Sequence, residues 1–130
     1  MATNKVKLRE HKDIRGSLVE SVLPRVMKES KHFFISKSKP GVIRGNHYHL
    51  RKSEWFYVIQ GKCKLVIEDI KTKKREEIIV DSKENIILNM ASNKAHAFKN
   101  IGKGQMILLA LINEVFDKND PDTYPYELKL

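Results

Sequence analysis

Short apolar runs recur along the chain, and turn-forming residues separate them. The runs are rich in β-branched and aromatic residues, which is typical of strands. The pattern predicts strands at Ser17–Val22, His32–Ser38, Val42–His49, Glu54–Gln60, Cys63–Asp69, Glu76–Val80, Asn85–Leu88, Ala95–Asn100 and Gln105–Asn113. A helical turn is expected only at Pro24–Glu29. Because long helical patterns between the strands are missing, the predicted fold class is all-β, an antiparallel sandwich or barrel.

Two of these runs indicate strands that are covered on both faces. In Glu54–Gln60 both alternating sets of side chains are largely apolar, and Met106–Ile112 is apolar at every position. Such strands lie between packed layers. The set Trp55, Tyr57 and Ile59 would stay partly in water on a lone small barrel, so a homodimer is expected.

The length of the chain fits one domain. At 130 residues, a single domain over residues 1–130 is predicted. The first ten residues are polar and charged, and no apolar run approaches the roughly 20 residues of a membrane span. A soluble, cytoplasmic protein with no membrane partner is expected. Cys63 is the single cysteine, which excludes an internal disulfide, and its alternation with Leu65 and Ile67 favours a core position.

The charge balance is strongly basic. Twenty-five Lys and Arg against 16 Asp and Glu give a formal charge of +9, which favours an anionic partner such as a phosphorylated ligand. The basic residues are scattered, and the cluster at Lys71–Arg75 falls in a predicted hairpin turn where solvated charge is ordinary. No nucleic-acid partner is therefore expected.

Candidate metal ligands occur at the facing ends of two predicted strands, Val42–His49 and Glu54–Gln60. His47 and His49 are two residues apart, so their side chains share one face of a strand. The connection Leu50–Ser53 then lets the next strand present Glu54 beside them. Two imidazoles and a carboxylate suit Zn, Fe, Mn, Ni or Co and leave coordination positions open. His96, on a later strand, is the expected fourth ligand.

A lone strand histidine is usually either partly exposed or hydrogen-bonded in the core. The shared spacing with a carboxylate favours a metal centre over that interpretation for the three histidines above. His11 and His32 fall outside the pattern and are interpreted as structural.

The spacing resembles the motifs of the cupin superfamily. The first cupin motif is matched at its fixed positions, which are Gly41, His47, His49, Glu54 and Gly61. His96 and Asn100 resemble the end of the second motif, although Asn85, Ala91 and Asn93 stand where the family often has Gly, Pro and Gly. This resemblance implies a jelly-roll barrel, a double-stranded β-helix, that holds one divalent metal ion.

A narrower resemblance concerns enzymes of nucleotide sugars. Asp13–Glu20 and Arg44–Tyr48 are similar to segments of the 3,5-epimerases of the deoxyrhamnose pathway. Asn113–Asp117 and Pro121–Tyr124 resemble the end of the zinc-binding cupin domain of the bifunctional capsular-polysaccharide enzyme that makes a fucosamine-type precursor. The related 3,4-ketoisomerases usually carry Gln where this chain has Glu54. The resemblance therefore favours the zinc-type epimerase, with zinc as the expected metal.

The resemblance implies a metal-dependent enzyme that acts on a nucleotide-activated 4-keto-6-deoxy sugar, as a C3-epimerase or a 3,4-ketoisomerase. The metal would stabilise an enolate formed next to the C4 ketone. Tyr48, Tyr57 and Lys94 are the groups near the motif that are expected to move protons. Arg15 and Arg44 are expected to hold the diphosphate, because a guanidinium grips phosphate with two parallel hydrogen bonds.

Two other functions use the same fold. A metal-dependent cupin dioxygenase or decarboxylase would need the same ligands and no phosphate site. A non-catalytic cupin would act as a sugar-binding or regulatory partner. Fold analogy supplies the site and leaves these alternatives open.

Overall fold

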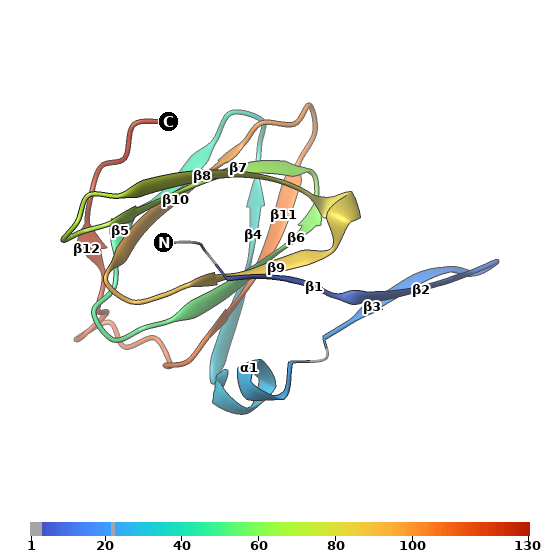
Figure 1. The fold of residues 1–130 in the computed structure, drawn as a ribbon, viewed down its shortest axis with the longest axis horizontal. Helices are drawn as coiled ribbons and strands as arrows, with labels where there is room; N and C mark the ends of the chain where they lie inside the picture. Colours follow the sequence, from blue (N-terminus) through green and yellow to red (C-terminus); the bar gives the residue numbers. More distant parts are fainter. Residues whose placement is uncertain (1–3, 22) are drawn as a thin grey trace.

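The computed structural model describes residues 4–21 and 23–130, which fold as two antiparallel sheets that face each other (Figure 1). The first sheet has five described strands in the order β1 (Lys5–Lys7), β9 (Ile86–Met90), β6 (Glu54–Gln60), β11 (Met106–Ile112) and β4 (His32–Ser38). The second has five in the order β12 (Tyr124–Pro125), β5 (Ile43–Tyr48), β10 (Lys94–Asn100), β7 (Lys62–Asp69) and β8 (Arg75–Asp81). This arrangement confirms the predicted all-β jelly-roll barrel.

One apolar core fills the space between the two sheets. Its buried members include Phe56, Val58, Leu65, Ile67, Val80, Leu88, Met90, Phe98, Met106 and Leu108. Strict alternation along β6 sends Phe56 and Val58 into this core and leaves Trp55 and Tyr57 half-buried on the outside. As predicted, β11 is a central strand, because it pairs with β6 on one side and with β4 on the other.

Two N-terminal strands, β1 and the strand that follows it, are not predicted by the apolar pattern. β2 (Arg9–Asp13) and β3 (Gly16–Glu20) form a hairpin that extends away from the barrel (Figure 1). Residues on β2 are polar and exposed, so no alternation marks the strand. β3 is shorter than the predicted Ser17–Val22, and Val22 lies outside the described residues.

The predicted helical turn is present as α1 (Pro24–Glu29), which buries Val26. Helix α1 lies outside the sheets, near the start of β4 (Figure 1). Within the described ranges, no helix is long and apolar enough to cross a membrane.

Two asparagines replace the glycines expected before His96. Asn85 and Asn93 have φ angles of 53° and 65°, in the left-handed region that asparagine tolerates better than most residues. Asn85 ends the short 3-10 helix η1 (Ser82–Glu84), and β9 begins one residue later. The turns of the second motif are therefore kept without the usual glycines.

The C-terminal segment lies against β5 and the connection that follows it. After β11 the chain passes over the connection between β5 and β6 and then adds β12 to the edge of the second sheet. Tyr124 pairs with Tyr48, and Pro125 pairs with His47. This segment therefore lies directly against the predicted metal ligands.

Candidate metal centre

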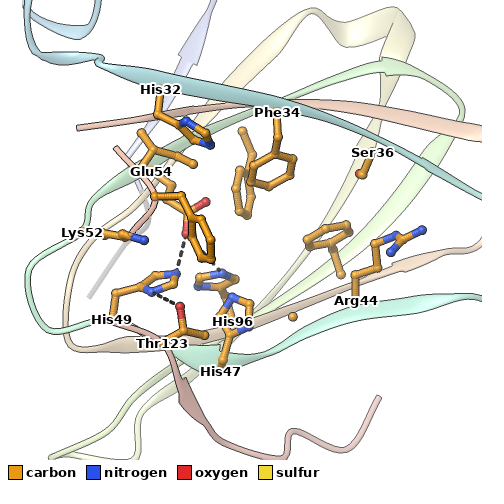
Figure 2. A pocket seen from close by; sticks show the side chains of 15 residues that line it. His32, Phe34, Ser36, Arg44, His47, His49, Lys52, Glu54, His96 and Thr123 are labelled. Carbon is orange, nitrogen blue, oxygen red and sulfur yellow. Dashed lines mark hydrogen bonds and ion pairs between the residues drawn. The ribbon is translucent and has the colours of Figure 1, made fainter. Parts of the chain in front are cut away.

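A cavity of about 360 Å³ lies inside the barrel. The predicted metal ligands line one part of it, and Arg44 lies apart from them at the other side (Figure 2). Phe34, Phe56 and Phe98 also line the cavity and give it an apolar wall. The cavity thus combines polar groups at two places with an apolar surface, which is the usual composition of a small-molecule site.

The four predicted ligands converge at a single place. One ligand atom from each of His47, His49, Glu54 and His96 lies within 4.8 Å of the others. The imidazole ring of His47 lies 4.9 Å from that of His49 and 4.8 Å from that of His96, measured between ring centroids. The histidines come from β5, the residue after β5, and β10, whereas Glu54 begins β6 in the opposite sheet.

An irregularity in β5 sets the direction of these side chains. His47 pairs with His96 and Gly45 pairs with Ala97, so Asn46 is an extra residue opposite β10. Gly45 has a φ of 96°, and a Cβ there would come within 2.7 Å of the carbonyl oxygen of His96. Glycine is therefore required at this bulge by both the backbone angle and the close approach.

The bulge also explains why Arg44 reaches the cavity. Residues three apart on a regular strand face opposite sides, but the extra residue lets Arg44 and His47 both line the cavity. The Nε of Arg44 donates to the Ser38 hydroxyl at 2.8 Å, and one Nη donates to the Lys37 carbonyl at 3.1 Å. These bonds leave further guanidinium N–H groups for a ligand.

The side chains of His49 and Glu54 are so close that a cation is needed between them. Nε2 of His49 lies 2.6 Å from Oε1 of Glu54, while Nδ1 of the same ring lies 2.6 Å from the carbonyl oxygen of Asp122. Because a carbonyl only accepts, Nδ1 carries the proton, and Nε2 of a neutral ring faces the carboxylate with its lone pair. The lone pair and the carboxylate oxygen repel each other, and a proton or a metal ion between these two atoms removes that repulsion.

Protonation in the site follows from burial and charge. Burial lowers the pKa of His96 to about 4, although the Glu54 carboxylate opposes the shift. Burial also lowers the pKa of His47. Burial alone would lower the pKa of His49, but Glu54 and the Asp122 carbonyl outweigh it and raise that pKa. Burial would raise the pKa of Glu54, yet the surrounding histidines lower it. These shifts favour the carboxylate of Glu54 and the neutral imidazoles of His47 and His96, which are the forms that bind metals.

The residues present fit a divalent metal ion. The Nε2 atoms of His49 and His96 lie 2.6 Å and 3.9 Å from the same Glu54 oxygen, and no hydrogen bond satisfies the buried His49 atom in the described part of the chain. Buried polar atoms in folded proteins are normally satisfied. Three imidazoles and one carboxylate at this separation form a donor set that suits zinc and its neighbours in the transition series.

The structure does not bring the three predicted proton-transfer groups to the cavity. Tyr48 stacks on Tyr124 on the outside of β5, at 5.3 Å between ring centroids. The hydroxyl of Tyr57 donates to Asn85 at 2.8 Å, also on the outside of the barrel. Lys94 starts β10 and does not line the cavity.

The two predicted phosphate ligands lie in different places. Arg44 lines the cavity. Arg15 lies at the tip of the β2–β3 hairpin, where it forms an exposed ion pair with Asp13. Its role in binding a diphosphate stays a prediction.

Several residues that line the cavity were missed by the sequence analysis. They are His32, Ser36, Lys52 and Thr123. His32 was interpreted as structural, but the alternation of His32, Phe34 and Ser36 along β4 sends all three side chains inward. No sequence signal marks Lys52, because its position depends on the distant C-terminal segment.

Cys63 and His11 lie away from the cavity. Cys63 is buried, and burial raises the pKa of its thiol to about 12, so it stays protonated. His11 contacts Glu20 at 3.0 Å across the β2–β3 hairpin. Neither residue lines the cavity.

A two-sheet jelly-roll barrel with three histidines and one glutamate gathered inside it defines a cupin. Residues 11–124 match the family described as the polysaccharide biosynthesis C-terminal domain. The chain belongs to this family.

Relatives agree with this assignment. The chain is 35% identical over 114 residues to UDP-2-acetamido-2,6-beta-L-arabino-hexul-4-ose reductase of Pseudomonas aeruginosa, covering 88% of this chain and 30% of the reductase. The capsular polysaccharide assembling protein CapF from Staphylococcus aureus has a TM-score of 0.74 and 30% identity, covering 93% of this chain and 34% of CapF. A 3,4-ketoisomerase from Helicobacter canadensis has a TM-score of 0.80 and 25% identity, and the match covers 95% of this chain and 90% of the ketoisomerase.

The chain spans about a third of the length of the reductase and of CapF, at 30% and 34%. It spans most of the ketoisomerase chain, at 90%. A domain of this kind therefore occurs both as part of longer proteins and as nearly a whole chain.

Proposed function

We propose that this chain is a metal-dependent enzyme domain that moves a proton next to the C4 ketone of a nucleotide-linked 4-keto-6-deoxy sugar, with epimerisation at C3 as its reaction. The observation that carries the proposal is the buried Glu54 beside three histidines at one part of a sugar-sized cavity. One relative is named for a UDP-linked hexul-4-ose and another is named a 3,4-ketoisomerase, and both names support this substrate class.

The proposed cofactor is one zinc ion on His47, His49, Glu54 and His96. When bound, a divalent ion would polarise the substrate ketone and so favour loss of the neighbouring proton. The chain's own contribution is to hold the four ligands in a buried pocket, where electrostatic interactions are stronger than in water.

The other cavity walls suit the rest of the substrate. Phe34, Phe56 and Phe98 offer an apolar surface for the C6 methyl group. The hydroxyl of Ser36 is buried without a hydrogen-bond partner in the described part of the chain, so a sugar hydroxyl would satisfy it. Arg44, with unused guanidinium N–H groups, is the proposed diphosphate ligand.

Lys52 is the proposed proton-transfer group. It lines the cavity and is buried, and its ammonium donates to the Pro121 carbonyl at 2.8 Å. The ring of Phe116 lies 5.4 Å from the same ammonium. These contacts hold the amino group of Lys52 beside the ligand cluster (Figure 2). As the neutral amine it would accept the C3 proton, and as the ammonium so formed it would return a proton to the sugar.

Ketone migration is the second candidate. The likeness to a 3,4-ketoisomerase over 90% of that chain favours it. Both reactions begin with removal of the C3 proton. Return of a proton to the opposite face of C3 gives the epimer, whereas protonation elsewhere moves the ketone, so the position of the proton donor decides between them.

Solvent exchange tests the proposed function. In deuterated water, the zinc-loaded protein is expected to exchange the C3 proton of one member of a panel of dTDP-, UDP- and GDP-linked 4-keto-6-deoxy hexoses. NMR follows the loss of the proton signal, and the coupling constants of the product separate epimerisation from ketone migration. The control is the same protein treated with a chelator, which should not exchange.

Binding of a sugar without exchange above the metal-free control would contradict the enzyme and support a sugar-binding module. Consumption of oxygen or release of carbon dioxide, with iron or manganese in the purified protein, would instead indicate a dioxygenase or decarboxylase.

The outer face of the first sheet is the proposed homodimer interface. Phe33 and Ile35 on β4 are 62% and 51% exposed, and they extend the apolar surface of Trp55, Tyr57 and Ile59 on β6. Contiguous exposed apolar patches of this kind usually mark interfaces.

Light scattering at micromolar concentration is expected to show a dimer for the wild type and a monomer for Ile35→Glu, because a charge in this face opposes its burial. The matched control is Ile79→Glu on β8, since Ile79 is 50% exposed on the other sheet. A monomeric wild type, or equal effects of the two substitutions, would contradict the interface.

A further inference from the structure

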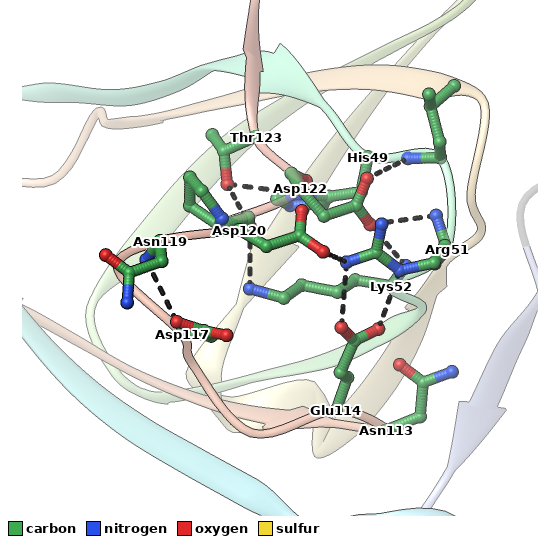
Figure 3. A network of polar contacts seen from close by, with 12 residues as sticks. His49, Arg51, Lys52, Asn113, Glu114, Asp117, Asn119, Asp120, Asp122 and Thr123 are labelled. Carbon is green, nitrogen blue, oxygen red and sulfur yellow. Dashed lines mark hydrogen bonds and ion pairs between the residues drawn. The ribbon is translucent and has the colours of Figure 1, made fainter.

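The segment between β11 and β12 is bonded along its length to the connection that carries two candidate metal ligands (Figure 3). The amide oxygen of Asn113 accepts from the backbone N–H of Ser53 at 3.0 Å. Arg51 donates to Glu114 at 2.9 Å and to Asp120 at 3.0 Å. These bonds show that the segment and residues 49–54 lie side by side.

Asp122 is the centre of this contact. It is 2% exposed, which is rare for an aspartate, and it has a φ of 49°. Its carboxylate accepts three successive backbone N–H groups, from Leu50 at 3.0 Å, Arg51 at 2.8 Å and Lys52 at 2.9 Å. One buried anion therefore fixes residues 50–52, which are three of the four residues between His49 and Glu54.

The main chain of Asp122 also contacts the site, at the imidazole ring of His49. The carbonyl of Asp122 accepts the Nδ1–H of His49 at 2.6 Å. This bond selects the tautomer whose Nε2 carries a lone pair, and that lone pair faces Glu54. Metal-binding histidines commonly have such a partner on the second ring nitrogen, and losing it weakens metal binding.

We propose that Asp122 is a positioning residue for the metal centre. Its carbonyl sets the tautomer and ring orientation of His49, and its carboxylate sets the distance between His49 and Glu54 by fixing the turn that joins them. The same turn carries Lys52, so Asp122 also places the cavity ammonium. This inference rests on the proposed metal binding. It means that a segment distant in the sequence sets the geometry of the ligands.

The Asp122→Asn substitution tests the carboxylate. Asparagine tolerates the left-handed backbone angle and is close in size, but it removes the negative charge and presents an NH₂ group to the turn. Zinc affinity, measured by competition with a chelator, is expected to fall about 10–100-fold. Hydrogen exchange of the amides of residues 50–52 is expected to be faster in the metal-free protein.

Asp120→Asn is the matched control. Asp120 is two residues away and pairs with Arg51, but its carboxylate accepts from that exposed side chain and not from the turn's backbone. Its zinc affinity and amide exchange should equal those of the wild type. Equal zinc affinities of the Asp122→Asn and Asp120→Asn proteins would overturn the role of the carboxylate.

The tautomer is tested in the wild type, so no variant needs to fold. Nitrogen-15 NMR of the metal-free protein in weakly alkaline buffer is expected to show His49 protonated at Nδ1. Protonation at Nε2 would overturn the role of the carbonyl. A wild type that binds no zinc but shows the Nδ1–H tautomer would contradict the proposed function and leave the orienting role of Asp122 standing.

Discussion

The Glu54→Gln protein is expected to bind zinc at least about 100-fold more weakly than the wild type while keeping its fold. Glutamine has the size of glutamate but lacks the charge that balances a divalent cation. Loss of a group that supports a metal ligand lowers metal affinity about 10–100-fold. Loss of the anionic ligand itself should lower the affinity at least as much. Elemental analysis and competition with a chelator measure the effect, and circular dichroism checks the fold.

His47→Ala and His96→Ala are expected to lose zinc in the same way, because the ligand atoms of all four residues form one cluster. The control is His32→Gln, since His32 lines the same cavity but is not part of the cluster. Full zinc occupancy in the three ligand variants would remove the metal centre from the proposed function.

Lys52→Met is expected to lower kcat for C3 proton exchange by roughly 10²–10⁴-fold, the usual contribution of a general acid or base. Methionine keeps the length and apolar character of the buried stem and removes the ammonium. KM should change less than kcat, because the group is proposed to act on the proton and not on the nucleotide. Zinc content should be unchanged, which separates this effect from damage to the metal centre.

Lys94→Met is the matched control, because Lys94 was predicted from sequence to move protons but does not line the cavity. Its kcat should equal that of the wild type. A large loss of kcat in Lys94→Met with none in Lys52→Met would favour the sequence-based assignment and contradict the one drawn from the structure.

The metal ligands could be found from sequence because their spacing is local. His47 lies on β5 and His49 directly follows it, and Glu54 begins β6 after one short connection. Arg44 illustrates the opposite case. Its inward direction requires the extra residue at Asn46, and strand periodicity alone does not place a bulge.

The other residues of the site could not be predicted from the sequence for a different reason. Lys52 and Asp122 are 70 positions apart in the chain, yet the Lys52 backbone N–H is bonded to the Asp122 carboxylate. Such contacts are set by tertiary packing, which a single sequence does not reveal. The exposed strand β2 was missed because its residues are polar at every position, so the hydrophobic signal that marks buried strands is absent.

The four ligands come from both layers of the barrel, since Glu54 belongs to the first sheet, His47 and His96 belong to the second, and His49 directly follows a strand of the second. An ion held by all four would join the layers as a removable cross-link, and the free energy of its binding would be added to that of folding. At a free-ion concentration a thousand times the dissociation constant, this amounts to about 4 kcal/mol. The lifetime of the folded chain in a cell would then follow the supply of metal.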